Sequence, residues 1–245
     1  TPDAPALGAL TGDLGNPTKR LLALSGRYER LAKREVLPVF ELVAVVGQGA
    51  PGVDGMWRRR MPFSVVDEYL RVARQAKALL LLDIQPGRSD FLSEAKHFDQ
   101  YLRAPDVGLA LDPEWDIRDG QRMGESFGRT SGKTIDAVAA YLSEIVSAGD
   151  LPEKVLVYHR VTGGVVEAPS DIVPRPGIAI VQSVDGIGSK AAKRKTYDFI
   201  HADKPRTARP GIKLFFEEDT RNGGTLMTPE DVLGLAPVPE YVMYE

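Results

Sequence analysis

The sequence contains no cysteine, only three histidines and no long apolar run. The absence of cysteine excludes disulfides, thiol nucleophiles and cysteine-ligated zinc sites. The scarcity of imidazoles argues against a histidine-rich metal centre, since only His97, His159 and His201 are available. No segment approaches the ~18 consecutive apolar residues of a membrane-spanning helix. We therefore expect no cofactor, no metal and no membrane span.

The sequence also lacks an excess of charge of one sign. Its 31 Lys and Arg residues nearly balance 34 Asp and Glu residues, for a net charge of −3. This balance argues against a nucleic-acid partner, and the basic tract at 190–199 is typical of the solvated face of a helix. The sequence begins with TPDAPALGAL and not with methionine, so we expect a processed protein that is secreted or displayed at the cell surface. Nothing in the sequence indicates an oligomeric state.

Short apolar runs alternate with helical patterns along the chain, and such runs predict buried strands. The expected strands are 5–10, 37–46, 79–84, 107–112, 153–161, 177–184, 211–218 and 241–245. Helical spacing and helix-cap signals are found at 16–35, 64–78, 93–105, 132–149, 189–202 and 228–235. The segment 162–176, between the fifth and sixth strands, has too much proline and glycine for a full helix.

Eight strands that alternate with helices predict a parallel sheet covered by helices. We expect this sheet to close into a (β/α)8 TIM-type barrel, with an irregular segment between strands five and six; an open, doubly wound sheet is the alternative. A length of 245 residues suits one such barrel, so we expect a single domain over residues 1–245. The active sites of these barrels lie at the carboxyl ends of the strands.

Polar residues gather at the expected carboxyl ends of the strands. They include Asp83, Asp112, Glu114, Tyr158, His159, Gln182, Asp185, Glu217 and Glu218. In the fourth strand, side-chain alternation places Gly108, Ala110, Asp112 and Glu114 on one face and large apolar residues on the other. Gly108 and Ala110 are small enough for the crowded interior near the barrel axis. Asp112 and Glu114, on the same face, are therefore expected at the open end of the barrel. Glu41, in the middle of the second strand, indicates either an inward acid with a partner or an exposed strand.

Several carboxylates at one pocket, without a thiol and with few imidazoles, favour acid–base cleavage of a glycosidic bond. One carboxyl group must carry a proton and another must be ionised, and close neighbours push each other's pKa values apart. We expect Glu114 to be the general acid and Asp112 to tune it. The expected base or nucleophile is one of Asp83, Asp185, Glu217 and Glu218. The expected residues for binding a carbohydrate polymer or oligosaccharide are Trp57, Trp115, Tyr158, His159 and Gln182.

The motif D-x-E at Asp112–Glu114 resembles the acidic motif of TIM-barrel glycoside hydrolases, including the Chalaropsis-type muramidases and the chitinase-like group. The resemblance covers the strand order and these three residues. It implies that Glu114 is the general acid and that Asp112 supports it. The chitinase-like motif has a further Asp two residues earlier, where this chain has Ala110. The muramidases have an Asp on the first strand, which the segment 5–10 lacks.

Other functions would use some of the same residues. A non-catalytic protein could bind a carbohydrate or another cell-surface partner through the same acids and aromatic rings. The pair His159–Arg160 is compatible with a phosphodiesterase, although such enzymes need a second histidine and a metal held by carboxylates. Asp83, Asp112 and Glu114 could hold a divalent cation through their oxygens.

Two glycine-containing segments resemble phosphate-binding motifs. The sequence GQGAPG at 47–52 matches G-x-G-x-x-G after a strand, but Pro51 interrupts it and no helical pattern follows. We therefore expect a loop there and no dinucleotide site. The sequence GIGSK at 186–190 lacks the spacing of a P-loop, so we expect Ser189 to be an ordinary helix cap.

Overall fold

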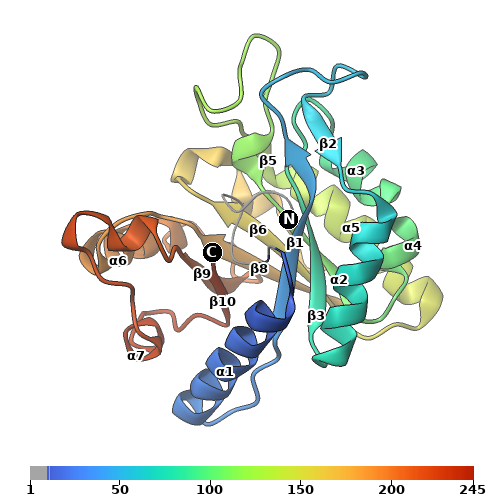
Figure 1. The fold of residues 1–245 in the computed structure, drawn as a ribbon. Coiled ribbons are helices and arrows are strands. Elements are labelled where there is room, and N and C mark those ends of the chain that lie inside the picture. The colour runs from blue at the N-terminus through green and yellow to red at the C-terminus, as the bar shows by residue number, and fades with distance from the viewer. Residues whose placement is uncertain (1–9, 11) are drawn as a thin grey trace.

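One curved eight-stranded sheet dominates the computed structural model, which describes residue 10 and residues 12–245 (Figure 1). The parallel strands are β1 (Val39–Gly47), β3 (Leu79–Ile84), β4 (Val107–Leu111), β6 (Lys154–Arg160), β8 (Ile178–Val184), β9 (Arg209–Leu214) and β10 (Tyr241–Tyr244). They follow one another across the sheet in chain order. At one edge, β2 (Arg58–Arg60) pairs antiparallel with the end of β1.

Helices connect most of these strands. They are α1 (Gly15–Ala32), α2 (Phe63–Gln75), α3 (Phe91–His97), α4 (Asp99–Leu102), α5 (Gly132–Gly149), α6 (Lys190–His201) and α7 (Pro229–Leu233). The 3-10 turns are η2 (Pro113–Trp115), η3 (Gly163–Val165), η4 (Pro169–Asp171) and η5 (Glu218–Gly223). The connection between β6 and β8 contains η3, η4 and the short strand β7 (Val166–Glu167), which pairs with β5 (Thr130–Ser131). None of the helices in the described part of the chain is long and apolar enough to cross a membrane.

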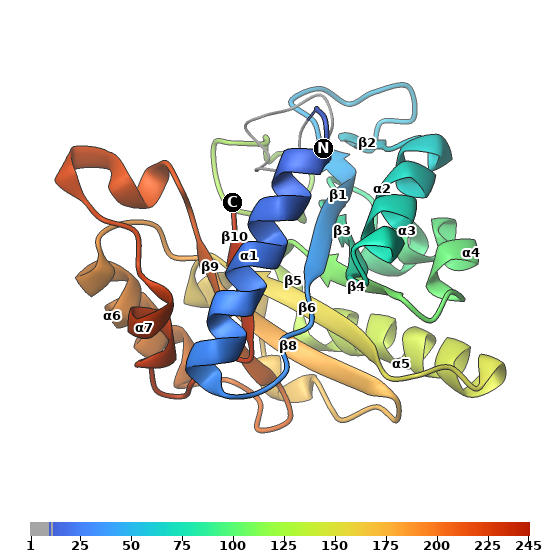
Figure 2. The same ribbon diagram turned by 60° about the horizontal axis from the view of Figure 1, so that its bottom comes forward.

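The expectation of a closed (β/α)8 barrel is wrong. The strand order is β10-β9-β8-β6-β4-β3-β1-β2, so β10 and β1 are not hydrogen-bonded to each other and the sheet is an open half-barrel. The strand expected at 5–10 lies outside the described residues except for Leu10, and the chain enters β1 from the helix α1. This helix lies beside β10 and β1 (Figure 2). It contacts β10 through Tyr28, whose hydroxyl is 2.7 Å from that of Tyr244.

The two faces of the sheet differ in the size and polarity of their side chains. On the outer face, Leu109 and Leu111 belong to the main apolar core, which includes residues of α2 and α5. On the inner face, Ala110 belongs to a small apolar cluster with residues of β3, β6 and β8. Gly108 is required here, because a Cβ atom would lie 2.4 Å from the carbonyl oxygen of Val155. The predicted alternation is therefore confirmed from Gly108 to Leu111, where β4 ends; Asp112 follows the strand and Glu114 lies in η2.

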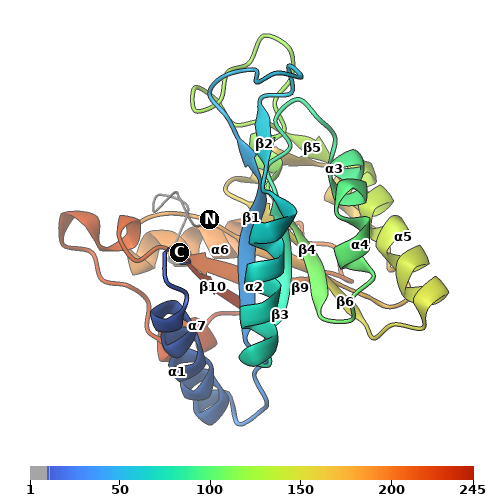
Figure 3. The same cartoon turned by 45° about the vertical axis from the view of Figure 1, so that its right-hand side comes forward.

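The loops that follow β1, β3 and β4 are joined to one another by backbone hydrogen bonds. They lie above the carboxyl ends of these strands, where the blue and green loops rise (Figure 3). The amide of Gly87 donates to the carbonyl of Trp115 at 3.1 Å, and the amide of Arg88 donates to the carbonyl of Met56 at 2.8 Å. Gly87 has φ +66°, and a Cβ atom there would lie 2.3 Å from the Met56 carbonyl oxygen. Only glycine permits this close approach. The loop at 47–52 continues into β2 and not into a helix, as predicted.

Candidate active site

A cluster of charged side chains occupies the inner face of the sheet near the carboxyl ends of its strands. Every parallel strand, or the residues directly after it, contributes at least one member. The members are Glu41, Asp83, Asp112, Glu114, His159, Asp185, Lys213 and Glu245. Charged groups withdrawn from water are costly unless they are paired or face a ligand. The cluster is therefore the strongest candidate for a functional site.

His159 lies at the centre of the cluster and is fully buried. Its Nδ1 atom is 2.8 Å from Asp185 Oδ2, and its Nε2 atom is 3.1 Å from Glu41 Oε1. Burial opposes a charge on the ring, but the negative charges of Asp185 and Glu41 outweigh burial and raise the pKa of His159 well above its usual range. Burial would likewise raise the pKa of Asp185, but His159 and Lys213 bring it down to about 2. The imidazolium is therefore held between two carboxylates.

Lys213 provides a second buried cation beside this pair. Its Nζ atom is 2.5 Å from Glu245 Oε2 and 3.5 Å from Asp185 Oδ2. Burial opposes the ammonium charge, but the carboxylates of Asp185 and Glu245 raise the pKa of Lys213 well above its usual value. In this half of the cluster, the cations His159 and Lys213 are therefore paired with the carboxylates of Glu41, Asp185 and Glu245.

In the other half of the cluster, three acids each have an oxygen without a hydrogen-bond partner among the described residues. These oxygens are Asp83 Oδ1, Asp112 Oδ1 and Glu114 Oε2. Burial, followed by repulsion from Asp112 and Glu41, raises the pKa of Asp83 well above its usual value. Burial, followed by repulsion from Asp112 and Asp185, raises the pKa of Glu114 to about 8. A buried polar atom without a partner costs about 1–3 kcal/mol, so these oxygens indicate a place for a ligand.

The structure brings together five of the residues expected from the sequence: Asp83, Asp112, Glu114, His159 and Asp185. It does not bring Glu217 and Glu218 to them. β9 ends at Leu214, before the expected end of that strand, so the two glutamates lie beyond the sheet. Glu217 is exposed, and Glu218 pairs with Arg221 at 3.1 Å on the surface.

Two of the expected sugar-binding residues point away from the cluster. Tyr158 and Gln182 alternate with the inward residues of β6 and β8, and they face the outer side of the sheet. The hydroxyl of Tyr158 donates to Gln182 Oε1 at 2.8 Å, and Gln182 Nε2 is 3.0 Å from His201 Nδ1. Both side chains are fully buried, so their role is to connect the sheet with α6.

The two tryptophans lie in the loops above the cluster. The guanidinium of Arg88 lies over the ring of Trp57, 4.8 Å from its centroid. Trp115 is half-buried and packs against the end of β1, where a Cβ atom on Gly47 would lie 2.8 Å from its ring. Both rings therefore support the loops.

The sequence interpretation missed Lys213, Glu245 and Tyr241, and it left the role of Glu41 open. The structure shows that Glu41 faces inward and has two partners. Besides His159, it accepts a hydrogen bond from the hydroxyl of Tyr241 at 2.5 Å. The available signal was a charged residue among apolar neighbours within a strand, Glu41 in β1 and Lys213 in β9.

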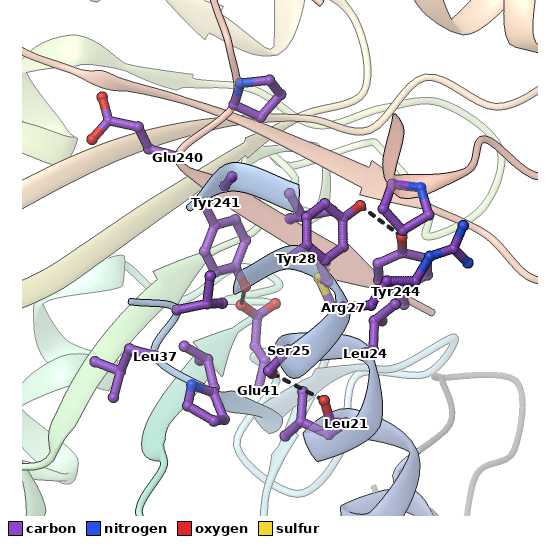
Figure 4. A pocket seen from close by; sticks show the side chains of 18 of the residues that line it. Leu21, Leu24, Ser25, Arg27, Tyr28, Leu37, Glu41, Glu240, Tyr241 and Tyr244 are labelled. Atoms are coloured by element: carbon purple, nitrogen blue, oxygen red, sulfur yellow. Dashed lines mark hydrogen bonds between the residues drawn. The ribbon is translucent and has the colours of Figure 1, made fainter. Parts of the chain in front are cut away.

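A pocket of about 1030 Å³ lies beneath α1 and reaches the cluster (Figure 4). Its wall is built by residues of α1, β1, β10 and the segment around α7, most of them apolar. Glu41, Tyr241 and Glu245 also line it. The open edge of the half-barrel therefore gives one side of the charged cluster access to a cavity.

Comparison of the chain with protein-family models, with curated protein sequences and with solved structures finds no match.

Proposed function

We propose that the protein is a glycoside hydrolase in which Glu114 is the general acid and Asp112 is the base or nucleophile. The observation that carries this proposal is the carboxyl group of Glu114. Its side chain is half-buried, its Oε2 atom is buried without a partner in the described part of the chain, and its pKa is raised to about 8. Cleavage of a glycosidic bond requires a carboxylic acid that still holds its proton near neutral pH.

Asp112 is the best candidate for the second carboxyl group. One of its oxygens accepts a hydrogen bond from Gln85 Nε2 at 3.0 Å, which fixes the side chain, and the other has no partner. Its charge raises the pKa of Glu114, which is the relation expected of an acid and its counterpart.

The other acids fit this role less well. The raised pKa of Asp83 favours its protonated form, which can neither attack nor activate water. Asp185 is held by His159 and by the hydroxyl of Ser183 at 2.9 Å, and its pKa of about 2 makes it a weak base. It is suited to holding His159 in place.

The proposed substrate is a polysaccharide or oligosaccharide that enters from the side of the loops after β1, β3 and β4. These loops are connected to one another by backbone hydrogen bonds, so they can form a stable wall for an extended ligand. Secretion or display at the cell surface stays a prediction of this proposal.

The test is the release of reducing ends from a panel of cell-wall and plant polysaccharides. It compares the natural protein with Glu114→Gln, Asp112→Asn and the exposed control Glu217→Gln. We expect release by the natural protein and by the control, and a loss of at least about a hundredfold in the two site variants. Full activity of Glu114→Gln would refute the assignment. Binding without release by the natural protein would favour a non-catalytic carbohydrate-binding protein.

A further inference from the structure

We propose that Glu41, Asp83 and His159 form a binding site for a divalent transition-metal ion of the Zn²⁺ class. The site lies in the same charged cluster, but it is distinct from the Glu114 and Asp112 pair and goes beyond the proposed hydrolase. It also differs from a cation site made of Asp83, Asp112 and Glu114.

The three side chains already have nearly the spacing of metal ligands. One ligand atom from each of them lies within 4.8 Å of the other two. Zinc bonds to nitrogen and oxygen are about 2.0–2.2 Å long, so two ligands of one tetrahedral ion lie about 3.4 Å apart. His159 Nε2 and Glu41 Oε1, which are 3.1 Å apart, are already close to this separation. Small side-chain rotations would therefore complete the coordination.

Asp83 provides an independent indication of a ligand. Its exposed fraction is only 3%, and its Oδ1 atom has no hydrogen-bond partner within the described ranges. The charges of Asp112 and Glu41 repel its carboxylate, and the attraction of His159 and Lys213 does not offset burial and this repulsion. A bound cation would give this oxygen the partner that it lacks and would offset the repulsion among the acids.

The neighbours of the three ligands hold them in the orientation that a metal requires. Asp185 contacts the Nδ1 atom of His159 at 2.8 Å and thereby directs Nε2 toward Glu41. A carboxylate on the far nitrogen of a metal-binding histidine is the usual arrangement in metalloproteins. Tyr241 donates to Oε2 of Glu41, which leaves Oε1 facing the imidazole.

The ligand set and the access route favour the Zn²⁺ class over Mg²⁺. One imidazole and two carboxylates suit transition ions, whereas Mg²⁺ prefers oxygen ligands in a regular octahedron. Binding would displace the protons that Asp83 and His159 hold without the metal, and the two carboxylate charges would then balance the divalent ion. Glu41 and Tyr241 line the pocket beneath α1, so an ion can enter from that side. Three protein ligands would leave a position open for water or a ligand from the pocket.

The test is calorimetric titration of the full chain with ZnCl₂ near neutral pH. The variants are Asp83→Asn and Glu41→Gln, and the matched control is Asp116→Asn, which removes a half-buried acid outside the cluster. We expect one ion per chain in the natural protein and in the control. In each ligand variant we expect the affinity to fall by at least about tenfold. MgCl₂ at the same concentration should produce no binding heat.

Thermal unfolding without metal shows whether each variant is folded, and addition of ZnCl₂ should raise the midpoint of the natural protein and of the control only. Two outcomes would overturn the proposal: no zinc binding by the natural protein, or equal zinc binding by a folded ligand variant. Equal binding of Mg²⁺ would overturn the choice of ion. The titration uses no carbohydrate, so its failure is distinguishable from failure of the hydrolase proposal.

Discussion

Replacement of Glu114 by Gln should stabilise the fold at neutral and alkaline pH, even though it removes the proposed catalytic acid. The pKa of the Glu114 carboxyl group has its ordinary value of 4.5 in the unfolded chain and is about 8 in the folded protein. Between these two pH values the unfolded chain releases the proton while the folded chain keeps it. The natural protein therefore loses stability as pH rises through this window, and the loss is complete above about pH 8. The amide of glutamine does not titrate, so the variant escapes this loss.

The size of the effect follows from the pKa difference. Each unit corresponds to 1.36 kcal/mol, which sets an upper limit of about 5 kcal/mol for the whole window. The side chain of Glu114 is only partly withdrawn from solvent, so screening reduces the expected gain to about 1–3 kcal/mol. Strained or destabilised active-site groups commonly show this opposition between stability and function.

The assay is urea unfolding of the natural protein and of Glu114→Gln at several pH values between about 4 and 9. The difference between their free energies of unfolding should be small near pH 4, grow through the window and level off above it. The exposed variant Glu217→Gln serves as control and should follow the natural protein. A difference between Glu114→Gln and the natural protein that does not change with pH would refute the proposed environment of Glu114.

Two further predictions concern the wall of the site. Gly87→Ala should lower the free energy of unfolding by about 2 kcal/mol or more, because its φ is +66° and the new Cβ atom would collide with the backbone of Met56. Gly120→Ala, at φ +85° with no atom within 4 Å, should cost less, and equal thermal midpoints for the two variants would contradict the argument. Glu94→Gln should cost about 3 kcal/mol in urea unfolding, because the fully buried carboxylate binds two arginines of β2 at 2.9 and 2.7 Å. A loss below about 1 kcal/mol would show that the ion pairs of Glu94 with Arg58 and Arg60 do not hold the edge strand β2 in place.

Local elements with strong patterns could be predicted from the sequence. The helix expected at 132–149 is α5, and the strand expected at 79–84 is β3, with the same bounds. Both have clear boundaries, since Ser131 caps the helix and the apolar run of the strand is continuous. The closure of the barrel could not be predicted in this way. It depends on whether β10 and β1 pair, and these strands are about two hundred residues apart in the chain.

The candidate site was predictable where strand ends were clear. Asp83, Asp112 and Asp185 were expected at the carboxyl ends, and the structure brings them into one cluster. Tyr158 and Gln182 were placed at the correct ends but on the wrong face, because neighbouring residues of a strand point to opposite sides. In the seventh expected strand both alternating sets ended in a glutamate, so the pattern could not select Lys213 as the inward residue.

The most direct test of the account is the pKa of Glu114 itself, measured by NMR on protein labelled with ¹³C at the glutamate carboxyl groups. The signal missing from Glu114→Gln would identify the residue. The account predicts that this carboxyl group titrates near pH 8, with the proton still bound at neutral pH. Titration of Glu114 at or below about pH 5, as for an exposed glutamate, would contradict its role as a general acid that burial and Asp112 keep protonated at neutral pH.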